Sequence, residues 1–146
     1  MKVRSTAKFR ADFPDDTVED EEDIIQYPGK GITEAIGEIL TRLGCKVSEP
    51  IDAAEHGWEL DAAIQGRRLW SQVTVTDEEV IFMFEDTSML SGLFRRNSPV
   101  YVEVLKGLDA ELRKDSRFHD IVWYAKDEFA FTPNPTGAPH PVDDPA

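Results

Sequence analysis

Three segments of alternating apolar and polar residues follow one another within residues 57–86. The first is Trp58–Ile64 and the second is Arg68–Thr76, with a turn signal at Gln65-Gly66 between them. A period of two is typical of a strand with one buried face. The third segment, Val80–Glu85, is apolar on both faces, which is typical of a central or covered strand. The pattern predicts a three-stranded antiparallel meander.

Two helices and three further strands are predicted around this meander, and the shortest of these strands lies at Cys45–Val47. Apolar residues recur at helical spacing over residues 32–43, and the following glycine is a favourable C-terminal cap. The second helix starts at Ser98-Pro99 and runs to about Lys114. Alternation also predicts strands over residues 2–13 and 118–124. We expect an α+β fold, with a mostly antiparallel sheet and two helices packed on one face.

The length of 146 residues fits one domain with a sizeable core, which we place at residues 1–131. Residues 132–146 contain five prolines, so they are predicted to be a disordered, proline-rich tail. No apolar run reaches the length of a membrane-spanning helix, and the first residues lack the apolar core of a signal peptide.

An acidic run at Asp12–Asp23 holds eight carboxylates and no Lys or Arg, within a chain of formal net charge −13. Such crowded like charges predict a mobile or loosely helical loop. A polyanionic surface repels nucleic acids and anionic membranes, so we expect neither as a partner and favour a basic protein. The preceding strand carries cations on one face: Lys2, Arg4, Lys8 and Arg10.

Two explanations of the acidic run therefore remain open at this point. The loop can recognise a partner, or it can fold back and neutralise the basic strand beside it. Charge reversal separates the two, because only a recognition surface loses binding while the fold survives.

A second acidic region lies in the meander, where Glu59 and Asp61 share one strand face. Trp70 falls on the polar face of the next strand, where a large aromatic is a candidate binding hot spot unless residues 87–97 cover it. The predicted partner-binding residues are Asp15, Asp16, Glu19, Asp20, Glu21, Glu22, Asp23, Glu59, Asp61 and Trp70.

The sequence contains no catalytic, metal or cofactor signature. Its histidines lack a second ligand at metal-binding spacing, so no metal site is predicted. The single cysteine, Cys45, precludes an internal disulfide and suits a cytoplasmic location. Gly29-Lys30-Gly31 precedes a helix, where backbone N–H groups can hold an anion, but its spacing differs from that of a P-loop.

In size, net charge, single cysteine and helix-plus-meander layout, the chain resembles small acidic α+β immunity proteins and antitoxins of bacteria. The resemblance covers residues 1–131 and implies no residue roles. It implies a non-catalytic cytoplasmic protein whose acidic surface plugs the basic cleft of a nuclease or another toxic effector.

Two other functions are compatible with the sequence. A small-molecule enzyme or binding domain would use a pocket between sheet and helices, with His56, Glu59, Asp61 and His119 as candidate groups. A phage or secretion-system accessory subunit would instead use residues 81–84 and 87–97 to meet a second copy of the chain or another subunit.

Overall fold

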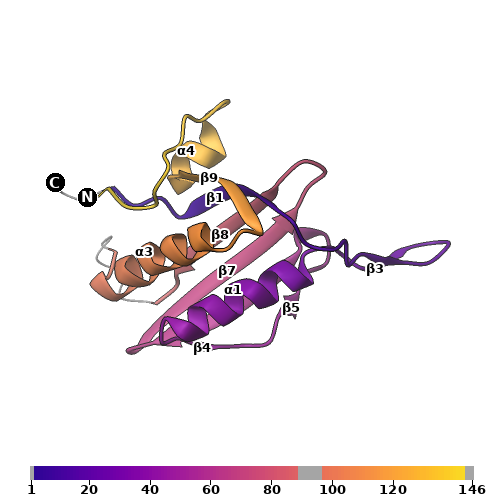
Figure 1. The fold of residues 1–146 in the computed structure, drawn as a ribbon, viewed down its shortest axis with the longest axis horizontal. Coiled ribbons are helices and arrows are strands. Elements are labelled where there is room, and N and C mark those ends of the chain that lie inside the picture. The colour runs from indigo at the N-terminus through magenta and orange to yellow at the C-terminus, as the bar shows by residue number, and fades with distance from the viewer. Residues whose placement is uncertain (1, 89–96, 144–146) are drawn as a thin grey trace.

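A computed structural model describes residues 2–88 and 97–143, and Figure 1 shows the fold. Within these residues seven strands form one sheet in the order β4-β6-β7-β8-β1-β9, and β5 also pairs with β6. The neighbours in this sheet are antiparallel. The strands are β1 (Thr6–Ala11), β4 (Lys46–Val47), β5 (Ile51–Asp52), β6 (Trp58–Ile64), β7 (Arg67–Val75), β8 (Val80–Asp86) and β9 (Phe118–Tyr124).

The predicted meander is confirmed as β6, β7 and β8. Asp61 pairs with Trp70 across β6 and β7, and Gln72 pairs with Met83 across β7 and β8. β8 lies between β7 and β1, so the strand that is apolar on both faces is central, as predicted. Its residue Phe82 is fully buried under the helices.

Two long helices, α1 (Lys30–Arg42) and α3 (Pro99–Lys114), cover one face of the sheet (Figure 1). Gly44 follows α1 with a positive φ of 99°, a conformation that glycine adopts without strain. The Ser98 hydroxyl accepts a hydrogen bond from the Tyr101 N–H at 3.0 Å and caps α3. The predicted α+β fold, with two helices on one face of a mostly antiparallel sheet, is therefore confirmed.

The opposite face of the sheet is covered only in part. A short helix, α4 (Lys126–Phe131), follows β9, and its Phe129 ring lies 5.6 Å from the Tyr124 ring. The Lys8 ammonium lies 5.4 Å from the centroid of the Phe129 ring, a cation–π distance. Between β5 and β6, residues Ala54–His56 form a single turn of 3-10 helix, η1.

The end of the chain differs from the disordered tail that its proline content predicts. Residues 138–143, which we term the strap, lie against the edge of the domain. Ala138 pairs with Trp123 of β9, and Val142 pairs with Val3 and is 5% exposed. The strap thus contributes a side chain to the hydrophobic core.

Proline lacks a backbone N–H group but keeps its carbonyl acceptor, and this explains how a proline-rich strap is held. The Pro141 carbonyl accepts a hydrogen bond from the Arg4 N–H at 2.7 Å. The Pro139 carbonyl accepts one from the Arg113 guanidinium. The proline carbonyls of the strap thus accept from donors elsewhere in the fold, while the Ala138 N–H of the strap donates to the Trp123 carbonyl at 2.8 Å.

Part of the connection 87–97, including Arg95 and Arg96, lies outside the described residues. Its predicted cover for Trp70 and its predicted subunit contact therefore stay predictions. Among the helices that the structure describes, none combines the length and the apolar character needed to cross a bilayer.

Candidate functional site

The acidic run forms a hairpin that stands away from the domain. Its two strands, β2 (Val18–Glu19) and β3 (Ile24–Gln26), make a separate two-stranded sheet. Figure 1 shows this acidic hairpin, labelled at β3, projecting beyond the main sheet and both long helices. The run is therefore an ordered projection, which differs from the mobile or loosely helical loop predicted from its charge.

Asp20 organises the tip of the acidic hairpin. Its carboxylate accepts hydrogen bonds from the backbone N–H groups of Glu22 at 2.9 Å and Asp23 at 2.8 Å. A short polar side chain that binds backbone two and three residues ahead closes a turn. These backbone donors hold the pKa of Asp20 below its usual range, so its carboxylate stays charged to a lower pH than that of an ordinary aspartate.

The base of the acidic hairpin is fastened to α1 by Asp16. Its carboxylate oxygens each accept a backbone N–H, from Gly29 and from Gly31, both at 2.8 Å. The backbone N–H groups before this helix can hold an anion, and here that anion is the carboxylate of Asp16. Asp16 has a role within the fold that its sequence context does not reveal, and we leave it out of the proposed binding surface.

Two further contacts fix the base. The Gln26 side-chain amide donates to the Asp16 carbonyl at 2.7 Å. The Trp58 indole N–H donates to the Tyr27 carbonyl at 2.9 Å, which joins the end of the acidic hairpin to β6. The acidic hairpin therefore has a fixed base on the sheet and helix, and an exposed tip.

The surface of the acidic hairpin is apolar as well as acidic. Val18, Ile24 and Ile25 are 47%, 39% and 60% exposed, an unusual exposure for such side chains. Within the described chain, the other exposed large apolar residues are Ile51 and Phe131. The carboxylates around these apolar side chains are exposed as well: Glu19, Asp20, Glu21, Glu22 and Asp23.

The basic face of the N-terminal segment is neutralised by carboxylates outside the acidic run. Arg4 binds Asp143 at 2.8 Å, and Lys8 binds Glu79 at 3.3 Å. The other two pairs are Lys2 with Glu128 at 3.6 Å and Arg10 with Asp120 at 3.7 Å. These four cations are therefore paired with carboxylates other than those of the acidic run, in contrast to the explanation in which the acidic loop folds back to neutralise them.

The remaining predicted residues, Glu59, Asp61 and Trp70, lie on the sheet away from the acidic hairpin strands. Trp70 is half-buried on the face opposite the helices, as the alternation predicts, and its indole N–H donates to Glu59 at 3.0 Å. Gln72 donates to the other oxygen of Glu59 at 3.4 Å. Glu59 thus has partners within the sheet, whereas Asp61 is exposed.

The groups proposed for an enzyme are spread across the sheet. His119 lies on β9 and pairs with Asp12 at 3.0 Å, whereas Glu59 and Asp61 lie on β6. Three strands separate β6 from β9, a distance of about 19 Å at 4.8 Å per strand. His56 pairs with Glu55 at 3.8 Å. These groups therefore do not form one acid–base centre.

Cys45 is buried, and burial raises the pKa of its thiol, as expected for a cysteine that packs as a small apolar residue. In the described ranges, no three side chains of the metal-ligating types gather around a common point.

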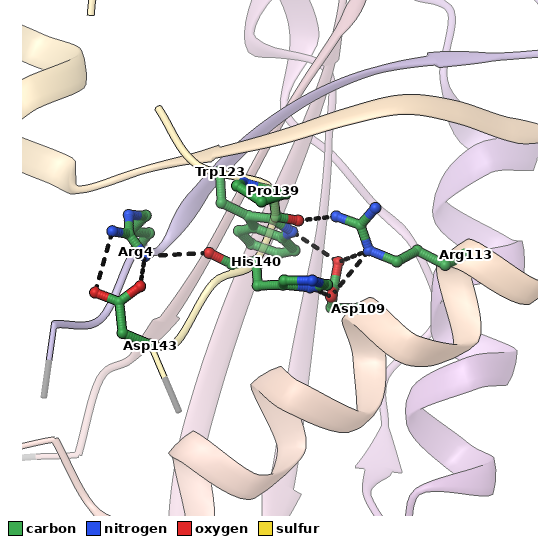
Figure 2. A network of polar contacts seen from close by, with 7 residues as sticks. All are labelled: Arg4, Asp109, Arg113, Trp123, Pro139, His140 and Asp143. Carbon is green, nitrogen blue, oxygen red and sulfur yellow. Dashed lines mark hydrogen bonds and ion pairs between the residues drawn. The ribbon is translucent and has the colours of Figure 1, made fainter. Parts of the chain in front are cut away.

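A second polar cluster, shown in Figure 2, surrounds Asp109 of α3. Asp109 is 4% exposed, and its carboxylate accepts hydrogen bonds from Arg113 and Trp123, both at 2.9 Å. His140 Nδ1 of the strap lies 3.0 Å from the same carboxylate. Both carboxylate oxygens thus have partners, and the cluster binds the strap to the domain (Figure 2).

A search of protein-family models, of curated proteins and of solved structures finds no match to this chain.

Proposed function

We propose that the chain is a non-catalytic cytoplasmic binding protein of the immunity or inhibitor kind, which presents the acidic hairpin to a basic protein partner. The observation that carries the proposal is the coincidence of exposed carboxylates and exposed Val18, Ile24 and Ile25 on one projecting element. The contacts of Asp16 and Gln26 fix the base, so little order has to be gained on binding.

The two kinds of surface have different tasks in this proposal. The carboxylates speed association with a basic protein and reject acidic partners. The apolar side chains supply affinity when they are buried, at roughly 25 cal/mol per Å² of apolar area. The partner class implied by the resemblance is a toxic effector with a basic cleft.

The first prediction concerns a variant in which the tip of the acidic hairpin loses negative charge. The variant keeps Asp20, because its carboxylate closes the turn. A variant with Glu19→Gln, Glu21→Gln and Glu22→Gln loses three charges that make no hydrogen bond or ion pair in the described part of the chain. We expect about ten-fold weaker capture of a basic protein from a lysate of the source cells, measured by quantitative mass spectrometry at low and moderate salt.

The matched control carries Glu34→Gln, Glu38→Gln and Glu49→Gln, which remove the same charge from exposed positions outside the acidic hairpin. It should capture the partner as the wild type does. An equal loss of partner capture in both variants would mean that the net charge of the protein, rather than the acidic hairpin, determines binding. If the wild type captures no basic partner, the proposal is refuted.

A further inference from the structure

A groove of about 480 Å³ lies at the base of the acidic hairpin. One wall is formed by residues 13–17, which lead from β1 into the acidic hairpin, and the other by residues 76–79 of the β7–β8 turn. Ile32 and Val75 are among the apolar residues that line it. The groove therefore places apolar side chains beside carboxylates from both walls.

The free charges of both walls are negative. Asp77 and Glu78 are exposed in the turn and make no hydrogen bond or ion pair with the described part of the chain. On the other wall, hydrogen bonds from the Thr17 hydroxyl and N–H hold the pKa of Asp15 below its usual range. Among the described residues that line the groove, the one cation is Arg10, which lies 3.7 Å from Asp120.

We propose that this groove receives a basic segment of the protein partner, with the aliphatic stem of a lysine or arginine along Val75 and its cation between Asp15 and Asp77. The inference rests on the proposed function and names a second contact for the same partner. Lysine and arginine bury their stems on apolar surface while their charged ends stay at a polar rim. A polyanion is repelled by these walls, and a bare metal ion has no stem to bury.

The test uses a capped hexapeptide of alternating arginine and leucine as the probe, titrated into the ¹⁵N-labelled full chain at about 0.15 M ionic strength. We expect saturable shifts of the backbone amides of Asp15, Ile32 and Val75. Asp77→Asn with Glu78→Gln should raise the Kd about five-fold, equivalent to about 1 kcal/mol. A peptide with glutamate in place of arginine should not bind.

The matched control is Glu34→Gln with Glu38→Gln, which should leave the Kd unchanged. Shifts confined to the tip of the acidic hairpin, or an unchanged Kd for the groove variant, would overturn the inference. The tip variant distinguishes the two proposals, because it should lose partner capture yet keep peptide binding in the groove. Peptide binding without any basic partner would overturn the proposed function alone.

Discussion

Asp16 caps α1 from a position thirteen residues before Gly29 in the sequence. Gly29 has a φ of 112° and no side chain with which to cap the helix, so the first N–H groups depend on a carboxylate from elsewhere. This arrangement makes one side chain responsible both for the start of the helix and for the attachment of the acidic hairpin.

The second prediction is that Asp16→Ala lowers the free energy of unfolding by about 1–2 kcal/mol, the range for loss of a helix N-cap with its charge. Urea denaturation followed by circular dichroism measures the change. Asp15→Ala is the matched control, because the hydrogen bonds that its carboxylate accepts from the described residues come from Thr17 in an exposed turn. Equal effects of the two substitutions would contradict the structural role of Asp16.

Among the elements, the strap is held both by backbone hydrogen bonds and by the Asp109 cluster, which contacts it through His140. The third prediction is that Asp109→Ala lowers the free energy of unfolding by about 3 kcal/mol, because it leaves Trp123 and Arg113 without their buried acceptor. Limited proteolysis should also cut the strap faster. Glu103→Ala on the exposed side of α3 is the control, because its side chain is 76% exposed, and a comparable loss there would refute the assignment.

The long elements of the fold could be predicted because their signals are local. The alternation of Trp58–Ile64 and the helical spacing of residues 32–43 each lie within one element, and both were confirmed. The Gly44 and Ser98 caps were readable for the same reason. Helix α4 was missed because its six residues, Lys126–Phe131, are too few to display a periodic apolar face.

The candidate site and the strap could be predicted only in part, because their decisive contacts are distant in sequence. The strap follows from contacts of His140 and Asp143 with residues 31 and 139 positions away. Proline content excludes a strand ladder but carries no information about such contacts. The charge of the acidic hairpin was evident, whereas its ordered shape depends on Asp16 and on the turn closed by Asp20.

At the scale of the whole molecule, the net charge is negative, and yet the pKa of some carboxyl groups is lower than usual. A hydrogen bond from Arg4, assisted by its charge, holds the pKa of Asp143 below its ordinary value of 3.8. A carboxyl group whose pKa is lower in the folded state than in the unfolded state stabilises the fold at any pH above its unfolded-state pKa. This stabilisation is lost as the pH falls through its folded-state pKa.

The fourth prediction follows from this direction of the pH dependence. Asp143→Asn should lower the melting temperature at pH 7, and its difference from the wild type should shrink as the pH falls below the ordinary value of 3.8. Thermal unfolding between neutral and acidic pH measures this difference. A difference that is constant across the range would show that the charge of Asp143 does not contribute.

The pairing of Val3 with Val142 has a topological consequence for the molecule. The first and last described segments of the chain therefore lie side by side, and Figure 1 places them at the far side from the acidic hairpin. A short linker could therefore close the backbone into a ring, with new ends opened at the exposed Gln65-Gly66 turn. Such a circular permutant would keep every strand pair of the sheet while reversing the order in which β6 and β7 are synthesised.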